Sequence, residues 1–494
     1  MGRFLLESAL SVYRKEEGNM TENVASTIQL VKEEQRKFFL SGKTRSLEFR
    51  LKELTRLENA IIKNQRQLKK ALYQDLGKSS YESHMTEIGM LLSEIRYMKK
   101  NLAKWEKRRR VSLSIAQFPA RGYCMREAYG CVLVIAPWNY PLLLSLQPVI
   151  GAIAAGNCVI LKPSEYALHT SRALKELVEQ IWKRNFVFVQ EGGAFISQTL
   201  LNQRFDFIFY TGGERVGKLV LKKAARHLTP TVLELGGKSP CIVTENANIK
   251  VAVRRVLFGK CLNSGQTCVA PDYLLIQESI KEQFITEWKK QIEQMYGKNA
   301  AYTREYPSII DEKHFERLEK LGYEAIEESE ISEEKKEKKK REWETCLQKK
   351  ALKIAPMLLE HISMDSNLMK EEIFGPILPI ITYRGLEEVK TFLQQKEKPL
   401  ALYIFTEDKQ EARKFIKQVS FGGGCVNDTI LHLSASTLPF GGVGGSGMGR
   451  YHGKYSYETF THEKGILEQK TWFDFSIRYM PYKKWKKRVL KKLY

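Results

Sequence analysis

The chain has 494 residues, of which 43% are apolar, so it can bury a sizeable core and is expected to form two or three domains. Its 80 basic and 57 acidic residues give a net charge of +23, which favours nucleic acid, anionic lipid or a phosphorylated cofactor without choosing among them. The eight cysteines and eight histidines show no paired or metal-ligand spacing, which excludes a disulfide framework and predicts a cytoplasmic protein with no metal site.

The N-terminal part of the chain is predicted to be helical. Glu7 interrupts the first apolar stretch too early for a signal peptide, and residues 1–27 are expected to form an N-terminal extension. From Ile28 to Arg110, apolar residues such as Leu47 and Leu51 recur at helical spacing among many charged ones. This pattern predicts amphipathic helices that form the outer layer of a larger domain.

The segment from Cys131 to Leu161 contains no charged side chain and is long enough to cross a bilayer. Several prolines and the Gly156-Asn157 pair punctuate it, and a single membrane helix would leave backbone groups unsatisfied there. We therefore expect a buried strand, loop, helix and strand, with a transmembrane helix as the alternative on length alone.

Short apolar runs bounded by Gly or Pro alternate with helical stretches in the middle of the chain. The runs are Val132–Ile135, Cys158–Leu161, Phe205–Tyr210 and Thr231–Leu235. Such alternation is typical of βα units on a parallel sheet with both faces covered, so the predicted fold class is α/β.

Two charged segments follow. Residues 324–344 are expected to form an exposed helix or helical hairpin, in which Glu334 pairs with Lys338 four residues on, and this surface insertion has no assigned role. Residues 478–494 carry eight basic side chains and no acidic ones, and Trp485 and Val489 fall near one helical face. That segment is predicted to contact anionic lipid peripherally, the alternative being a frayed or surface-docked tail.

Cys268 ends a loop of small, turn-forming residues, Asn263 to Thr267. Gly265 would let backbone N–H groups approach a bound carbonyl closely, and the Cys268 amide can itself donate to an oxyanion. A single cysteine in such a loop is most often inert, so a nucleophilic role for Cys268 requires partners elsewhere in the chain.

Two further residues are candidate partners of this thiol. Glu234 follows an apolar strand and precedes two glycines, which suits a general base, although a strand-end capping acid has the same pattern. Asn139 lies in a loop stiffened by two prolines, where its neutral amide would stabilise negative charge; the alternative is a turn Asn bonded to its own backbone.

Two segments are suited to a dinucleotide. Lys162 and Glu165 lie just past a strand, where they could clamp ribose hydroxyls, and Glu165 would disfavour a 2′-phosphate, which favours NAD over NADP. Gly212, Gly213 and Gly217 open a helix whose amides could face a pyrophosphate. Their spacing is not GxGxxG, and an ordinary helix-initiating turn explains it equally well.

Taken together, these segments resemble the aldehyde dehydrogenase superfamily, and most closely its class 3 or fatty-aldehyde branch. The resemblance runs from about Ile28 to about Leu467 and rests on LELGGKSP, NSGQTCVAPDY, EEIFGP and PFGGVGGSGMGRYHG, in family order. It implies an α/β fold with a Rossmann-like cofactor domain, a catalytic domain and a small bridging arm that makes a homodimer. It also implies NAD- or NADP-dependent oxidation of aldehydes to carboxylic acids.

The resemblance assigns roles to individual residues. It implies that Cys268 is the nucleophile, Glu234 the base that activates water, and Asn139 the side-chain half of the oxyanion hole. It further implies that Lys162 and Glu372 hold ribose hydroxyls.

Other roles that the resemblance implies concern the cofactor and the substrate. Phe374 is expected near the nicotinamide ribose, and Gly212 to Gly217 are expected to face the pyrophosphate. Glu214 departs from the small residues usual there, and its charge would repel phosphate unless it turns away or pairs with Arg215. The candidates for an apolar pocket that accepts medium- or long-chain aliphatic or aromatic aldehydes are Tyr140, Phe258, Leu262 and Tyr451, with core packing as the alternative.

The expected domain boundaries follow from these assignments. The cofactor domain comprises 28–110 and 129–233, the catalytic domain 234–424, the bridging elements 111–128 and 425–460, and the basic tail 461–494. A cysteine acyltransferase or amidase is the rival enzyme, but no histidine lies in a convincing partner motif. The non-enzymatic rival is a basic RNA- or membrane-binding protein, although no specific nucleic-acid partner is expected.

Overall fold

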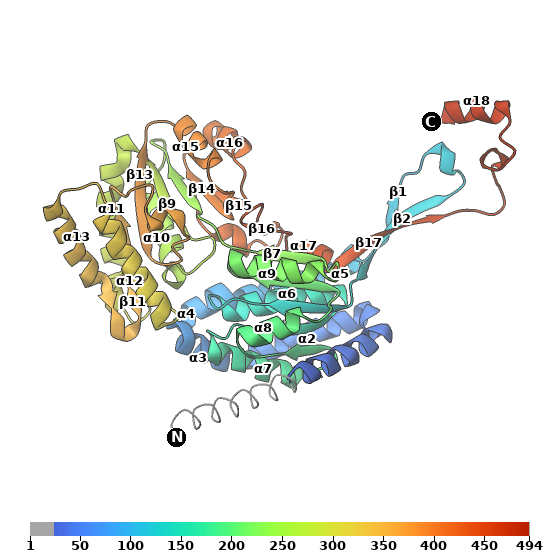
Figure 1. Cartoon of the computed structure of the whole chain (residues 1–494), viewed down its shortest axis with the longest axis horizontal. Helices are drawn as coiled ribbons and strands as arrows, with labels where there is room; N and C mark the ends of the chain where they lie inside the picture. Colours follow the sequence, from blue (N-terminus) through green and yellow to red (C-terminus); the bar gives the residue numbers. More distant parts are fainter. Residues whose placement is uncertain (1–23, 494) are drawn as a thin grey trace, which may run out of the picture.

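The computed structural model describes residues 24–493, and within them two six-stranded sheets and one three-stranded sheet organise the chain. Figure 1 shows two α/β units side by side, with a long arm projecting from the first of them. The strand order is β16-β7-β6-β3-β4-β5 in the first unit and β12-β13-β9-β8-β14-β15 in the second.

The sheet of the first unit is parallel except for its edge strand β16, which runs antiparallel to β7. Its strands are β3 (Cys131–Ile135), β4 (Cys158–Lys162), β5 (Val187–Val189), β6 (Phe207–Thr211), β7 (Thr231–Glu234) and β16 (Gly447–Met448). Every residue of β3 and β4 is buried, as expected for a parallel sheet covered on both faces. The four predicted apolar runs therefore lie in this sheet.

Helices cover both faces of this sheet. They are a first helix over residues 24–40, α2 (Leu47–Lys63), α3 (Gln65–Leu76), α4 (Ser80–Ser83), a π-helix η2 (His84–Ile88), α5 (Gly89–Trp105), α6 (Pro141–Ala155), α7 (Leu168–Ile181), α8 (Ala194–Leu201) and α9 (Glu214–Ala225). As the amphipathic pattern predicts, their apolar side chains face the interior; Leu54, Leu57 and Ile61 of α2, for example, are fully buried.

The uncharged segment 131–161 forms strand β3, a loop, helix α6 and strand β4, as the sequence predicts. Helix α6 is buried along nearly its whole length and ends at Gly156, whose positive φ of 95° caps it. No helix within residues 24–493 is long and apolar enough to span a membrane.

The second unit has an entirely parallel sheet. Its strands are β8 (Pro240–Val243), β9 (Tyr273–Gln277), β12 (Met357–Leu359), β13 (Ile377–Tyr383), β14 (Ala401–Phe405) and β15 (Gly423–Val426). Its helices are α10 (Ile249–Cys261), α11 (Lys281–Tyr296), α12 (Glu312–Glu327), α13 (Glu333–Cys346), α14 (Asn367–Lys370), α15 (Leu386–Gln394) and α16 (Lys409–Gln418). A two-stranded ribbon of β10 (Leu347–Gln348) and β11 (Lys353–Ile354) follows α13.

The charged segment forms a helical hairpin of α12 and α13, as predicted. Along α13, Glu333–Lys336 and Glu337–Lys340 pair at 2.9 and 3.0 Å, three residues apart, and Lys340 also pairs with Glu327 of α12 at 2.7 Å. The predicted pair of Glu334 with Lys338 is not among the ion pairs of the described residues. Trp343 is fully buried, and its ring lies so close to Gly322 that a Cβ there would be 2.4 Å from it. The hairpin is therefore anchored by a core tryptophan and is not only a solvated insertion.

The arm is a three-stranded antiparallel sheet of β1 (Arg109–Val111), β2 (Arg121–Ala128) and β17 (Thr461–Glu468). The third strand thus comes from 461–494, the segment expected to be the basic tail, and residues 425–460 do not supply it. Their β16 instead joins the first sheet, and helix α17 (Gly453–Thr459) packs against α6. Strand β17 is mostly polar and exposed, so no hydrophobic alternation marks it in the sequence.

After the arm, the chain continues to helix α18 (Lys484–Leu493), which Figure 1 shows at the far end from both α/β units. Trp485, Val489 and Leu490 are all exposed on this helix. The predicted N-terminal extension, 1–27, lies outside the described residues up to position 23, and its last four residues are helical.

Candidate active site

Cys268 lies in the loop that follows α10, and its side chain is partly exposed. The loop begins with a 3-10 turn, η4 (Leu262–Gly265), in which Asn263, Ser264 and Gly265 all have positive φ angles. A Cβ on Gly265 would lie 2.4 Å from the Gly375 carbonyl oxygen, so only glycine fits this close approach. Burial, together with the nearby Glu372 and Glu234 carboxyls, raises the pKa of the Cys268 thiol.

Glu234 is the last residue of β7 and is only 2% exposed. Neither of its carboxyl oxygens has a hydrogen-bond partner among the described residues. Burial raises the pKa of this carboxyl well above its ordinary value, because nothing compensates the charged form for its lost water. The glycine-rich segment approaches it closely, since Gly447 of β16 pairs directly with Glu234.

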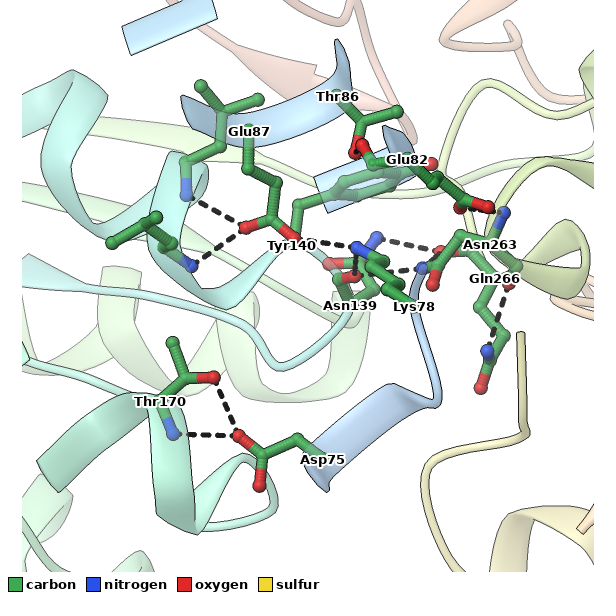
Figure 2. Close-up of polar contacts among 12 residues, drawn as sticks. Asp75, Lys78, Glu82, Thr86, Glu87, Asn139, Tyr140, Thr170, Asn263 and Gln266 are labelled. Carbon is green, nitrogen blue, oxygen red and sulfur yellow. Dashed lines mark hydrogen bonds and ion pairs between the residues drawn. The ribbon is translucent and has the colours of Figure 1, made fainter. Parts of the chain in front are cut away.

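Asn139 is 3% exposed and lies in the loop between β3 and α6. Its side-chain Nδ2 donates to the Gln266 carbonyl at 3.1 Å, two residues before the thiol. Its own carbonyl accepts from the Asn263 Nδ2 at 2.8 Å, so the two loops are joined in both directions (Figure 2). An amide nitrogen carries two protons, so this hydrogen bond to Gln266 uses one of the two Nδ2 protons of Asn139.

A single apolar cavity of about 160 Å³ connects the thiol and the carboxyl. Cys268 and Glu234 both line it, and so do all four predicted pocket residues, Tyr140, Phe258, Leu262 and Tyr451. Asn139 lies outside its lining. The Tyr140 hydroxyl is hydrogen-bonded to the Thr267 hydroxyl at 2.7 Å, which keeps this tyrosine beside the thiol loop.

Sequence reasoning missed much of the cavity wall. The other lining residues include Met85, Thr86, Met90, Leu143, Leu144, Gln147, Thr211, Ile430, Leu431, Leu433, Phe440 and His452. Two of them lie on the π-helix η2 and others on the 3-10 helix η8 (Leu431–Ser434), elements that apolar periodicity does not predict. Only Phe440 and His452, within the glycine-rich motif, carried a signal. Burial lowers the pKa of His452 to about 3, so its imidazole is neutral.

A second, larger cleft of about 1480 Å³ lies next to this cavity. Its lining includes Gly213, Gly236, Gly237 and Glu372. Glu234 and Leu235 line the apolar cavity, so the two spaces are lined by consecutive residues of one segment. A Cβ on Gly236 would lie 2.0 Å from Glu372 Oε2, so this glycine lets the Glu372 carboxyl reach the boundary. Burial and Asp272 raise the pKa of Glu372 to about 8.

The cleft suits a dinucleotide. Helix α9 begins after Gly213, which has no side chain to cap the helix, and a Cβ at this position would meet no atom within 4 Å. No side chain at Gly213 therefore covers the first amides of the helix, which are available to an anion in the cleft. Glu214 lines the same cleft, and its carboxylate pairs with Lys218 at 2.6 Å, not with Arg215. Gly212 and Gly217 pack closely on Tyr210 and Leu235, which holds the helix against the sheet.

The remaining predicted cofactor residues, Lys162, Glu165 and Phe374, do not line this cleft. Lys162, at the end of β4, forms an ion pair with Glu165 at 2.5 Å. Phe374 has a positive φ of 51°, and its ring meets the Trp138 ring edge-on at a centroid distance of 5.3 Å. The fold and the site are therefore those of an α/β enzyme that has a thiol beside an apolar cavity and a cleft suited to a dinucleotide next to it.

The chain belongs to the aldehyde dehydrogenase family, whose model matches residues 15–466. It is 45% identical over 450 residues to the 4,4′-diaponeurosporen-aldehyde dehydrogenase of Staphylococcus aureus, covering 90% of this chain and 95% of that protein. It is 44% identical to the dimeric NADP-preferring aldehyde dehydrogenase of Rattus norvegicus, covering 87% and 92%. A solved structure, the substrate-bound state of Staphylococcus aureus AldH, superposes with a TM-score of 0.89 at 43% identity, covering 94% and 99%.

These findings confirm the predicted fold class and activity. The chain is an oxidoreductase that oxidises aldehydes with NAD or NADP, and the class 3 resemblance is confirmed by relatives such as the family 3 member H1 of Arabidopsis thaliana, 43% identical over 93% of both chains.

Proposed function

We propose that Cys268, Glu234 and Asn139 carry out aldehyde oxidation in this chain. The observation that carries the proposal is the shared apolar cavity, in which a partly exposed thiol meets a buried carboxyl with no hydrogen-bond partner among the described residues. A buried acid without a partner is costly, and such groups concentrate where catalysis uses them.

The chemistry follows from these side chains. The Cys268 thiol loses its proton to water, and the thiolate attacks the carbonyl carbon. The oxygen of the tetrahedral adduct becomes an oxyanion held by the Asn139 amide and the Cys268 N–H. Loss of hydride from the former carbonyl carbon leaves a thioester on Cys268. Glu234 then takes a proton from water, the hydroxide attacks the thioester, and the carboxylic acid and the thiol are released.

The adjoining cleft fits the cofactor that this reaction needs. When bound there, a nicotinamide dinucleotide would supply the acceptor for the hydride. Lys162, Glu165 and Glu372 would hold its ribose hydroxyls, Phe374 would lie near the nicotinamide ribose, and Gly212 to Gly217 with the amides of α9 would hold the pyrophosphate. The carboxylate of Glu165 favours NAD over NADP by repelling a 2′-phosphate.

The substrate is a medium- or long-chain aliphatic or an aromatic aldehyde. The walls of the cavity are almost entirely apolar, and aromatic rings such as Tyr140, Phe258 and Tyr451 contribute to them. The test supplies purified protein with NAD or NADP and aldehydes from acetaldehyde to long-chain and aromatic members, and follows absorbance of the reduced cofactor. We expect kcat/KM to rise with chain length; a preference for acetaldehyde would contradict the assignment.

Replacing Asn139 with alanine tests the oxyanion role. One donor to such an oxyanion lowers the barrier by about 3 to 4 kcal/mol, so kcat should fall by roughly a hundredfold or more. Steady-state kinetics measure this, and circular dichroism checks that the fold is retained. Unchanged turnover in a folded Asn139→Ala protein would remove Asn139 from the mechanism.

The arm supports a homodimer. Its three strands project from the first unit, and Ile115, Phe118 and Leu467 of the arm segments are at least half exposed. Large apolar side chains on a projecting sheet are typical of an assembly interface. The relative from Rattus norvegicus is named as dimeric, in agreement with this proposal. Light scattering of the purified protein should give twice the chain mass.

The C-terminal segment is proposed to contact anionic lipid. Exposed Trp485, Val489 and Leu490 accompany eight basic residues over 478–494, with no acidic residue among them. Deleting 478–494 should abolish sedimentation with phosphatidylserine-containing vesicles and leave dehydrogenase activity intact.

Two controls separate lipid binding from other causes. Vesicles of phosphatidylcholine alone should bind the full chain weakly, because the basic charges then have no partner. The Lys484→Gln/Lys487→Gln/Arg488→Gln variant keeps the apolar residues and should lose most of the binding. Equal sedimentation of the full and shortened chains, or lost activity on deletion, would contradict the proposal.

A further inference from the structure

A buried ion pair outside the catalytic cavity lies directly behind Asn139 (Figure 2). Lys78 Nζ and Glu87 Oε1 are 2.7 Å apart, and both side chains are completely buried. Lys78 enters the interior because Gly77 ends helix α3 with a positive φ of 63°, and Glu87 lies on the π-helix η2. Neither residue lines the cavity, and the polar ends of both side chains are bonded to groups of the protein.

The ammonium group of Lys78 is directed at the loop that carries Asn139. It donates to the Asn139 carbonyl oxygen at 3.0 Å and lies 3.9 Å from the centre of the Tyr140 ring. The same carbonyl accepts from Asn263 Nδ2 at 2.8 Å. Two donors from different elements therefore fix the orientation of the Asn139 peptide.

The carboxylate of Glu87 completes the arrangement at the beginning of α6. Its Oε2 accepts from the amides of Leu142 and Leu143 at 2.9 and 3.1 Å. Tyr140, at the N-cap position, supplies no side-chain cap, and Pro141 has no N–H. Glu87 therefore acts as the missing cap, from a distant segment, and its negative charge suits a helix N-terminus.

We propose that the Lys78–Glu87 pair positions Asn139, so that its amide is fixed relative to the Cys268 loop before an aldehyde binds. The pair joins three segments that would otherwise move independently: the end of α3, the π-helix beside the cavity, and the loop from Asn139 to α6. Apolar side chains would fill the same space, but they would supply neither a donor to the Asn139 carbonyl nor an acceptor for the α6 amides. This inference depends on the proposed oxyanion role of Asn139.

A double-mutant cycle tests the coupling. The Lys78→Met/Glu87→Gln change removes both charges together, avoiding an unpaired buried ion, and Gln retains an acceptor for the α6 amides. In the wild-type background we expect kcat to fall by about tenfold or more, and in the Asn139→Ala background by less than about twofold, because a positioning effect has nothing left to position.

Two further readouts distinguish positioning from damage to the fold. Alkylation of Cys268 by iodoacetamide creates no oxyanion, so its rate should stay within about twofold of wild type. The dissociation constant for NAD should also be unchanged. A fall in alkylation or in NAD binding comparable to the fall in kcat would overturn the proposal in favour of a purely structural role.

The matched control is Arg50→Met, because Arg50 is a buried charge on helix α2 that contacts the C-terminal end of α6, opposite the end that Glu87 caps. Arg50 is 3% exposed, and its Nη1 donates to the Ala154 carbonyl at 2.9 Å. Any effect of Arg50→Met on kcat should be the same factor in both backgrounds. If the Lys78→Met/Glu87→Gln change also lowers kcat by the same factor in the wild-type and Asn139→Ala backgrounds, the proposed coupling is wrong.

A second variant covers loss of folding. Lys78→Arg keeps the positive charge and moves the donor atoms away from the Asn139 carbonyl, so the same pattern with a smaller loss is expected. The two proposals fail separately. If Asn139→Ala alone leaves turnover unchanged, the oxyanion role fails. If Asn139→Ala lowers kcat, and the Lys78 variants lower it further by the same factor as in the wild-type background, only the positioning inference fails.

Discussion

Replacing Cys268 with serine is expected to abolish aldehyde-dependent reduction of the dinucleotide. A serine hydroxyl is not ionised at neutral pH and is a far weaker nucleophile, so kcat should fall by on the order of 10⁴-fold or more. The measurement is absorbance of the reduced cofactor under saturating aldehyde and NAD. Mass spectrometry should at the same time detect an acyl adduct on Cys268 of the wild-type protein during turnover and none on the variant.

Cys124→Ser is the matched control. Cys124 is also partly exposed, but it lies on strand β2 of the arm, away from both cavities. Its replacement should leave kcat within about twofold, as for other changes outside a site. Substantial turnover by a folded Cys268→Ser protein, or comparable losses in the two variants, would contradict nucleophilic attack by this thiol.

The core of the fold and the approximate place of the site could be predicted from the sequence, because both depend on local signals. Uncharged apolar runs such as Cys158–Leu161 predict strands of a parallel sheet that is covered on both faces, and the structure places β4 there. Glu234 is recognisable because it ends such a strand before two glycines, and ligands bind at that edge of an α/β sheet.

What the sequence could not predict depends on contacts between distant segments. Strand β17 is polar, and only its pairing with β2 makes it a strand. The π-helix η2 places Met85 and Thr86 in the cavity wall, although its sequence has no distinguishing period. Lys78 and Glu87 look like two ordinary surface charges among many, and only the fold shows that both are buried.

The missing hydrogen-bond partners of Glu234 are another property that no motif reveals. LELGGKSP identifies the carboxyl, but its raised pKa arises from burial between β7 and the glycine-rich segment that returns from the second unit. The Cβ of any residue other than glycine at 447 would lie 2.2 Å from the Leu233 carbonyl, so the motif encodes this close approach. The chemical environment of the acid is thus a product of tertiary structure.

The Glu234→Gln change is expected to separate formation of the thioester from its hydrolysis. Glutamine cannot take a proton from water, so the steady-state rate should fall by about 10²- to 10⁴-fold. Attack by Cys268 and loss of hydride do not require this base in the proposed mechanism. Rapid mixing should therefore show a burst of one reduced dinucleotide per site followed by slow turnover. Loss of the burst as well would mean that Glu234 also serves the thiol.

The pH dependence provides the independent check on this assignment. Because burial raises the pKa of Glu234, its basic form becomes populated at a higher pH than for an exposed glutamate and increases as pH rises. The steady-state rate of the wild-type protein should therefore rise with pH, and Glu234→Gln should lose that rise. The burst rate should keep its own increase with pH, since burial also raises the pKa of Cys268. The control is Glu94→Gln, because burial also raises the pKa of Glu94 but this residue does not line the cavity; both pH profiles should be unchanged in this variant. A steady-state rate of the wild-type protein that does not change with pH would exclude Glu234 as the base.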